Sequence, residues 1–311
     1  MTVGIVWHDR YLDHASPGHP ERPERLTAIR EALDAAGEWQ RLTPIEARPV
    51  DEADLLRVHD AEYVDRVRRT AEADGTVWFD PDTYACPASA EAASLAAGGV
   101  CAAADAVVAG DVQSAFCPVR PPGHHARRGR GMGFCLFNNI AIAARRLKAV
   151  HGLTRILIVD WDVHHGNGTQ ETFYADPDVL YVSTHQWPHY PGTGAADQTG
   201  QGEGRGTTLN YPLPHGSDDA AFLASIDDAL AEAEDFRPQF VLISAGFDAH
   251  RDDPLAGLRL TESGFAEATR RVRDLAEKTA GGRIVSTLEG GYDADALGRC
   301  AVAHVQALHN E

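Results

Sequence analysis

The chain has 311 residues, of which 43% are hydrophobic and 24% are charged. This composition is typical of globular proteins and excludes the disordered and fibrous classes. Aspartate and glutamate (46) outnumber lysine and arginine (28), which gives a formal net charge of −18. That excess argues against a nucleic-acid-binding protein, because binding to phosphates requires clustered basic side chains. A cationic substrate or a basic protein partner remains compatible with it.

Cysteine usage and the start of the chain favour a cytoplasmic protein. The five cysteines are an odd number and none forms a CxxC pair, so we expect free thiols in a reducing compartment. The N-terminus lacks a basic segment followed by a long apolar run, so no signal peptide is expected. The most apolar window, Ala92–Ala104, is too short to span a bilayer, and we expect no membrane contact.

Short apolar runs alternate along the chain with longer amphipathic stretches. Several runs are apolar at both odd and even positions, as expected of strands that helices cover on both faces. This alternation predicts βαβ units, a parallel sheet and one α/β domain over residues 1–311, because no linker-like composition divides the chain. In chain order the predicted strands are Val3–Trp7, Ser114–Pro118, Arg155–Asp160, Val179–Ser183, Phe240–Ser244 and Arg283–Leu288.

The predicted helices lie between these strands. In the first of them Leu26, Ile29 and Leu33 form one apolar stripe, and Gly37 suits the end of the helix. The glycine-rich stretch Gly192–Gly206 is expected to be a loop rather than a hinge between domains. In chain order the predicted helices are Glu21–Ala36, Asp51–Thr70, Ala88–Ala109, Asn139–Val150, Asp218–Asp235, Glu262–Lys278 and Ala294–His309.

Chemically reactive side chains follow four of the predicted strands. Carboxylates, imidazoles or a phenol stand beside glycines at each of these strand ends. In open α/β sheets ligands bind beyond the carboxyl ends of the strands, so the four segments should meet in one crevice. The segments are residues 120–125, 160–168, 245–248 and 289–292.

Asp162, His164 and Asp248 are the leading candidates for a metal site. Asp162 and His164 are two residues apart on an extended segment, so their side chains point the same way. With Asp248 from a second strand they would supply three ligands and leave one position for water, which is the arrangement of catalytic zinc sites. Each residue alone could instead cap the turn after its strand, but the set together favours the metal.

Two further groups could act beside such a metal. The adjacent His124 and His125 follow a stiff proline-glycine loop and could transfer protons, although an exposed loop pair would have the same sequence. Tyr292 follows two glycines, and its phenol could stabilise an oxyanion, although a packed core tyrosine is the plainer interpretation. We expect His165, in the second HH pair, to pack rather than to react.

These segments resemble the histone deacetylase and acetylpolyamine amidohydrolase family. The wording of two motifs, DWDVHHGNG and LEGGYD, is most similar to class II deacetylases and their bacterial relatives. The resemblance runs from Trp7 to the C-terminus and implies an arginase-like α/β fold, an eight-stranded parallel sheet flanked by helices, and one zinc ion per chain. The motifs are RPPGHHA (120–126), GFCLFNN (133–139), DWDVHHGNGTQ (160–170), SAGFDAH (244–250) and LEGGYD (288–293).

By this resemblance the three candidate metal residues match the zinc ligands of the family. His125 matches the general base that later acts as the acid, and His124 matches the histidine that tunes the electrostatics. Tyr292 matches the tyrosine that clamps the scissile carbonyl. Asp160 and Asn167 match the positions behind the two histidines. Class I enzymes carry aspartate at the second of these positions, so we expect His125 to be less basic here.

The resemblance also implies a substrate tunnel. Phe134 and Tyr190 match its two aromatic walls, and Gly133 matches the position whose carbonyl meets the substrate amide. Tyr190 is a mild departure, because phenylalanine is more usual there. Leu255 at the rim and Gly291 complete the expected substrate contacts. A structural K⁺ or Na⁺ ion is implied as well, with Asp160, Ser183 and Thr184 as ligands together with Asp162 and His164.

Position 255 bears on the choice of substrate. Polyamine-selective relatives carry a glutamate there that attracts a distant cationic amine, and Leu255 cannot supply that attraction. We therefore expect a hydrolase that removes acetyl or other acyl groups from the side-chain amine of acetyl-lysine in proteins or peptides and releases acetate. The alternative is an acetylpolyamine amidohydrolase or a deacetylase of another small acetylated amine. A homo-oligomer is compatible with the sequence.

Two functions from other classes fit the sequence less well. A binuclear manganese ureohydrolase on a related fold would need further aspartate and histidine ligands for a second ion, and the aspartate-rich pattern that those enzymes repeat on two strands is missing. A non-catalytic module that binds acyl-lysine or a metal would not need the tandem histidines and the tyrosine in addition to three metal ligands.

Overall fold

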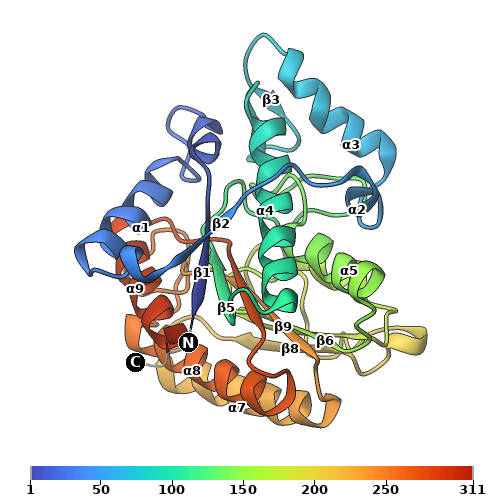
Figure 1. Cartoon of the computed structure of the whole chain (residues 1–311), viewed down its shortest axis with the longest axis vertical. Coiled ribbons are helices and arrows are strands. Elements are labelled where there is room, and N and C mark those ends of the chain that lie inside the picture. The colour runs from blue at the N-terminus through green and yellow to red at the C-terminus, as the bar shows by residue number, and fades with distance from the viewer. Residues whose placement is uncertain (1, 310–311) are drawn as a thin grey trace.

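Parallel strands form one eight-stranded sheet at the centre of the molecule (Figure 1). The computed structural model describes residues 2–309, and within them the sheet has the order β2-β1-β5-β10-β9-β6-β7-β8 with every neighbouring pair parallel. The expected α/β fold is therefore confirmed. The strands are β1 (Val3–Trp7), β2 (Thr43–Glu46), β5 (Ser114–Cys117), β6 (Ile156–Asp160), β7 (Val179–Gln186), β8 (Thr208–Leu213), β9 (Phe240–Ala245) and β10 (Ile284–Leu288), besides a small antiparallel pair of β3 (Val77–Trp78) and β4 (Tyr84–Ala85).

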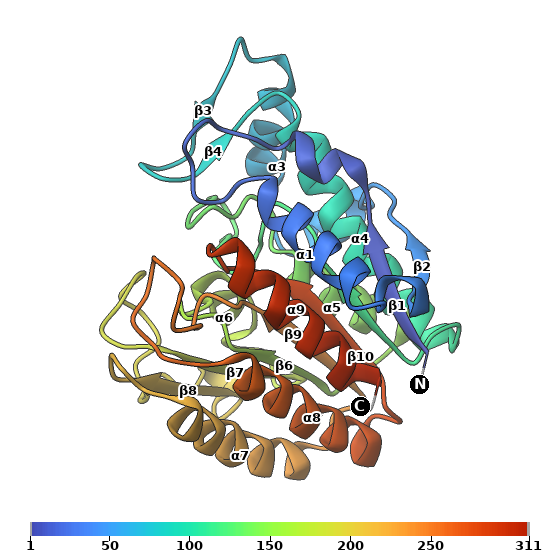
Figure 2. The same cartoon turned by 90° about the vertical axis from the view of Figure 1, so that its left-hand side faces the viewer.

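Helices cover both faces of this sheet. Helices α1, α9, α8 and α7 form a layer in which each contacts the next, as Figure 2 shows. Helices α4 and α5 pack together over the other face, and α4 contacts β1, β5 and β10. The α-helices are α1 (Glu24–Ala35), α2 (Glu52–Leu56), α3 (Ala61–Arg68), α4 (Ser89–Ala109), α5 (Asn139–His151), α6 (Asn167–Phe173), α7 (Asp219–Phe236), α8 (Glu262–Thr279) and α9 (Ala294–His309), and 3₁₀ turns span Asp9–Asp13, Trp39–Arg41, Arg69–Glu72 and Gly202–Gly204.

The four strands at the middle of the sheet are buried along their whole length. Every residue of β5, β10, β9 and β6 is buried. Their sequences are mostly apolar at both odd and even positions, because helices cover the sheet on both faces. Polar side chains interrupt these runs: Ser244 and Ser286 have hydrogen-bond partners, whereas Ser114 Oγ and Thr287 Oγ1 have none in the described part of the chain.

The structure departs from the predicted elements in several places. Strands β2 and β8 at the two edges of the sheet were not predicted, because most residues of β2 are exposed and only half of those of β8 are buried. The small antiparallel pair β3–β4 was not predicted either. The predicted helix Asp51–Thr70 is divided into α2, α3 and a 3₁₀ turn. A short helix, α6, begins inside the segment 160–168, where no helix was predicted.

Helix α4 is longer than the apolar window Ala92–Ala104 suggested. It has 21 residues and is long and apolar enough to cross a membrane by length and composition alone. However, 67% of its most apolar window is buried inside the protein, against β1, β5 and the neighbouring helix α5. These contacts identify α4 as a core helix of this fold.

Candidate active site

The four reactive segments meet at one edge of the sheet. Each follows one of the four central strands β5, β10, β9 and β6, which are consecutive neighbours in the sheet. Because all four strands are parallel, their carboxyl ends lie at the same edge. The order of the strands thus explains how residues that are far apart in the sequence reach one site.

Asp162, His164 and Asp248 form a compact cluster at this edge. Their ligand atoms all lie within 4.8 Å of one another, and His164 Nδ1 is 3.1 Å from both Asp162 Oδ1 and Asp248 Oδ2. Backbone amides orient the two carboxylates: Gly290 N–H donates to Asp162 Oδ2 (2.7 Å), and Val163 N–H donates to Asp248 Oδ1 (2.9 Å). The cluster is therefore held in place before any ligand arrives.

The electrostatics of this cluster suit a bound cation. Burial, together with the charge of Asp162, raises the pKa of Asp248. Burial disfavours a charged His164, yet its hydrogen bonds to the two carboxylates raise its pKa to about 10. The two buried carboxylates thus require a neighbouring positive charge. Two carboxylate oxygens and one imidazole nitrogen, with no fourth protein ligand in the group among residues 2–309, match the donor set of a catalytic divalent metal.

The tandem histidines lie next to the cluster and differ in charge. His124 Nδ1 is 3.0 Å from Asp160 Oδ2, whereas His125 Nδ1 is 2.7 Å from the neutral amide oxygen of Asn167. Burial opposes protonation of His124, but the Asp160 carboxylate outweighs it and raises the pKa to about 10. Burial and the neighbouring imidazoles lower the pKa of His125 well below its usual value. His125 is therefore the neutral imidazole that can accept a proton.

Tyr292 completes the set of reactive groups. Burial raises the pKa of its phenol well above the usual value, so the hydroxyl keeps its proton and can donate a hydrogen bond. The guanidinium of Arg25 lies 4.8 Å from the ring centroid, and Arg25 Nε donates to the carbonyl of Gly291 (2.6 Å). Gly291 has a φ of +123°, a conformation that other residues rarely adopt, so the turn before the tyrosine depends on glycine.

A cavity of about 240 Å³ leads to these groups. Gly133, Phe134, Tyr190 and Leu255 line it, as the sequence predicted for substrate contacts, whereas Gly291 is not among its lining residues. The exposed Asp82 and the half-buried His189 were not predicted, because nothing in their local sequence indicates that they reach this cavity. The complete lining is Asp82, His125, Gly133, Phe134, His164, His189, Tyr190, Leu255 and Tyr292.

Comparison with known proteins identifies the family. The model of the histone deacetylase domain matches residues 19–308 of this chain. The chain belongs to the histone deacetylase domain family. A probable deacetylase of Archaeoglobus fulgidus is 45% identical over 300 residues, covering 95% of this chain and 82% of that protein. A histone deacetylase-like amidohydrolase of Pseudomonas aeruginosa is 43% identical over 296 residues, covering 94% of this chain and 78% of that protein.

Relatives with solved structures or other named substrates agree with this assignment. The crystal structure of the HDA15 HD domain superposes with a TM-score of 0.94 at 42% identity, covering 100% of this chain and 88% of that one. The human polyamine deacetylase HDAC10 is 41% identical over 331 residues, which cover 99% of this chain and 48% of that protein. The relatives of this chain therefore include proteins named histone deacetylase and a protein named polyamine deacetylase.

In this histone deacetylase family member, three of the residues predicted to bind a monovalent cation lie on the neighbouring strands β6 and β7. Asp160 and Ser183 are paired in register on β6 and β7. Asp160 Oδ2 accepts hydrogen bonds from Tyr181 Oη and His124 Nδ1 at 3.0 Å each, and Ser183 Oγ is 2.9 Å from His185 Nδ1. Thr184 Oγ1 is buried without a hydrogen-bond partner in the described part of the chain.

One carboxylate that sequence reasoning missed supports the tandem histidines. Glu289 is buried and accepts hydrogen bonds from the backbone N–H of Gly123 (2.7 Å) and of His124 (3.1 Å) through Oε2. Ser244 Oγ donates to its other oxygen at 3.0 Å. Its place in the LEGGYD motif, directly after a central strand, is a signal that could have revealed it. His165 packs as expected, with its two ring nitrogens near Thr193 and Gln170.

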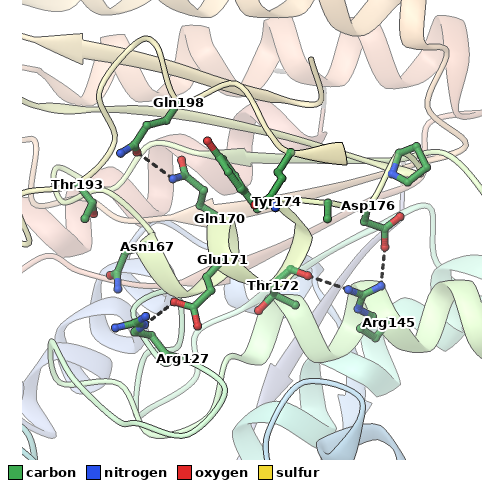
Figure 3. Close-up of a pocket in the computed structure, with 13 residues that line it drawn as sticks. Arg127, Arg145, Asn167, Gln170, Glu171, Thr172, Tyr174, Asp176, Thr193 and Gln198 are labelled. Atoms are coloured by element: carbon green, nitrogen blue, oxygen red, sulfur yellow. Dashed lines mark hydrogen bonds and ion pairs between the residues drawn. The ribbon is translucent and has the colours of Figure 1, made fainter. Parts of the chain in front are cut away.

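A larger cavity of about 780 Å³ lies on the far side of Asn167, and Figure 3 shows it. Its walls carry ion pairs between Arg127 and Glu171 and between Arg145 and Asp176. The candidate metal residues, both tandem histidines and Tyr292 are not among its lining residues. We therefore place the reaction in the smaller cavity, and Asn167 is the residue that links the two.

Proposed function

We propose that this family member is a zinc-dependent lysine deacetylase that hydrolyses the side-chain amide of acetyl-lysine in proteins or peptides. One observation carries the proposal. One cavity is lined by His164 of the three-residue metal cluster, by the neutral imidazole of His125 and by the protonated phenol of Tyr292. Amide hydrolysis requires these groups: a Lewis acid, a base and a donor to the carbonyl oxygen.

Asp162, His164 and Asp248 would hold the zinc ion, which would polarise the scissile carbonyl and acidify a water molecule. His125 accepts a proton from that water while the oxygen of the water forms a bond to the carbonyl carbon. The Tyr292 phenol donates a hydrogen bond to the carbonyl oxygen as negative charge develops there. His125 then returns the proton to the amine nitrogen as the carbon–nitrogen bond breaks, so that acetate and the free amine leave.

The walls of the cavity support an acyl-lysine substrate. Phe134 and Tyr190 would enclose an aliphatic stem, and Leu255 adds an apolar contact at the rim. A small acetylated polyamine is the alternative, and two observations favour it: Asp82 places a carboxylate on the cavity wall, and one relative is named a polyamine deacetylase. We favour acyl-lysine because Leu255 is uncharged and so cannot attract the second, cationic amine of an acetylated polyamine at the rim of the cavity.

Steady-state kinetics on the metal-reconstituted enzyme test the proposal. Protein stripped with a chelator and then loaded with one equivalent of zinc should release acetate from acetyl-lysine peptides with a higher kcat/KM than from acetylspermidine. Tyr292→Phe and His125→Ala should each lower kcat by roughly 100-fold or more, because each removes a group that acts in the transition state.

Three results would contradict the proposal. A higher kcat/KM for acetylspermidine would favour the polyamine alternative. Two manganese ions per chain would favour a ureohydrolase. Zinc-loaded protein that binds acetyl-lysine peptide and releases no acetate would favour a binding module.

Two accessory features belong to the same proposal. We propose that a K⁺ or Na⁺ ion binds near the zinc site through Asp160, Ser183 and Thr184. Asp160 and Ser183 are paired on neighbouring strands, Thr184 Oγ1 has no hydrogen-bond partner among residues 2–309, and hard cations prefer oxygen ligands. We also propose that the enzyme works in the cytoplasm. The five cysteines are all free thiols, as expected in a reducing compartment.

A further inference from the structure

Asp253 connects the rim of the substrate cavity to Tyr292. It lies in the loop between β9 and α8 and is only 7% exposed. Its Oδ1 accepts a hydrogen bond from the backbone N–H of Leu255 (2.9 Å), and its Oδ2 accepts one from the backbone N–H of Tyr292 (2.7 Å). A single carboxylate thus joins a rim residue to the tyrosine at the base of the cavity.

The loop that carries Tyr292 needs such contacts, because two glycines precede the tyrosine and Gly291 has a φ of +123°. Four groups from other parts of the described chain hold this loop, and one is the backbone N–H of Phe247, which donates to the carbonyl of Gly290 (3.0 Å). Asp162 accepts from Gly290 N–H, Arg25 donates to the carbonyl of Gly291, and Asp253 accepts from Tyr292 N–H. Of these bonds, the one to Asp253 acts on the backbone of the tyrosine itself.

The position of Tyr292 matters because a donor to a developing oxyanion works only at hydrogen-bonding distance and in line with the oxygen. A displacement of about 1 Å in such a group can lower the rate by roughly 100-fold. Leu255 lies on the cavity wall, so a group that fixes Leu255 and Tyr292 together also fixes the rim relative to the phenol.

We propose that Asp253 is a positioning residue for deacetylation: its carboxylate holds the backbone of Tyr292 against that of Leu255, so that the phenol stays aimed at the scissile carbonyl. This inference rests on the function proposed above. Asp253 is absent from the residues that line the cavity and acts through Tyr292 rather than on the substrate.

Asp253→Asn tests this role with little change of shape. The amide keeps one acceptor oxygen and loses the other, so one of the two loop bonds must break. Asp252→Asn is the matched control, because the neighbouring Asp252 is exposed and pairs with Arg299 at the surface. In the zinc enzyme with an acetyl-lysine peptide, we expect Asp253→Asn to lower kcat by roughly 10- to 100-fold with KM within about threefold, and Asp252→Asn to stay within about twofold.

A double-mutant cycle separates positioning from a general structural role. If Asp253 acts through the phenol, Asp253→Asn should lower kcat by less than about twofold in a Tyr292→Phe background. An equal loss of kcat in both backgrounds would overturn the proposal. Asp253→Ser, which also retains a single acceptor, repeats the cycle if the asparagine variant does not fold.

Hydrogen exchange at the backbone amides of Leu255 and Tyr292 gives a readout that is independent of the substrate. We expect exchange to be faster by roughly tenfold at one of these two amides in Asp253→Asn and unchanged at both in Asp252→Asn, because one of the two amides loses its acceptor. Unchanged exchange at both amides in Asp253→Asn would overturn the positioning role whatever the activity. Wild-type protein that releases no acetate while the exchange behaves as expected would instead overturn the proposed function.

Discussion

Burial and the neighbouring imidazoles lower the pKa of His125, and the hydrogen bond to Asn167 opposes this only weakly. The amide oxygen of Asn167 lies 2.7 Å from His125 Nδ1, where a carboxylate would stabilise the imidazolium. Asn167→Asp should therefore raise the pKa of His125 by roughly 1–3 units. Because the base must be neutral to accept a proton, the acidic limb of the kcat/KM profile should move to higher pH by a similar amount. The measurement is a pH profile of the zinc-loaded variant against the wild type, and an unmoved acidic limb would show that His125 is not the base.

Leu255 is the residue at which substrate preference should be changeable. It lines the cavity, its backbone is held by Asp253, and its side chain brings no charge. Leu255→Glu would add a carboxylate that attracts a second, cationic amine on the substrate. The ratio of kcat/KM for acetylspermidine to that for an acetyl-lysine peptide should rise by roughly 10-fold or more. Leu255→Gln, of the same length without the charge, is the control, and equal ratios for both variants would refute the electrostatic explanation.

At the residue scale, functional side chains that directly follow strands could be predicted from the sequence. Side chains that contact the site from elements distant in the sequence could not. Asp162, His164 and Asp248 stand directly after buried strands, so their meeting place follows from the sheet. Arg25 and Asp253, in contrast, reach the tyrosine loop from elements distant in the sequence. No local pattern marks such a contact, because a buried arginine or aspartate is recognised only once its partner is in place.

At the element scale the prediction succeeded where burial is uniform. The central strands are apolar throughout and were predicted almost to the residue, whereas edge strand β2 has mostly exposed residues. The predicted helix Asp51–Thr70 breaks because His59 and Asp60 bond to the loop after the tandem histidines. His59 Nδ1 lies 3.0 Å from the carbonyl oxygen of Arg127, and the backbone N–H of Asp60 donates to the carbonyl oxygen of Arg128 (2.9 Å). Tertiary hydrogen bonds of this kind override the amphipathic pattern.

Helix α4 offers an element-scale prediction at Gly98. A Cβ atom there would lie 1.8 Å from the carbonyl oxygen of Arg48 and 2.6 Å from the amide nitrogen of Val50, so the helix and the segment after β2 would have to separate. Replacing glycine by alanine in an open helix usually stabilises by about 1 kcal/mol. Here we expect Gly98→Ala to lower the free energy of unfolding by about 1–3 kcal/mol in urea denaturation. A stabilised variant would mean that α4 packs less closely than the structure shows.

At the scale of the whole molecule, buried neutral histidines should limit stability in acid. Burial lowers the pKa of His59 and His185 to about 4 and that of His165 and His304 to about 3. As the pH falls below about 6.5, the unfolded chain takes up these protons and the folded protein does not. Each such histidine should therefore cost about 1.4 kcal/mol of unfolding free energy per pH unit between about pH 6 and pH 4.

His304 is the histidine at which this dependence can be isolated. Its two ring nitrogens lie 2.8 Å from Thr269 Oγ1 and 2.8 Å from Ser286 Oγ, so it joins α9 to α8 and β10. It is not among the residues that line the substrate cavity. His304→Gln can keep one of these bonds but has no proton to gain. Urea denaturation in chelator at pH 7.5, 6.0 and 5.0 should show the variant less stable at pH 7.5, with a pH slope shallower by about 1 kcal/mol per unit. His215→Gln, at an exposed position, controls for loss of an imidazole, and parallel slopes for His304→Gln and the wild type would exclude this source of acid sensitivity.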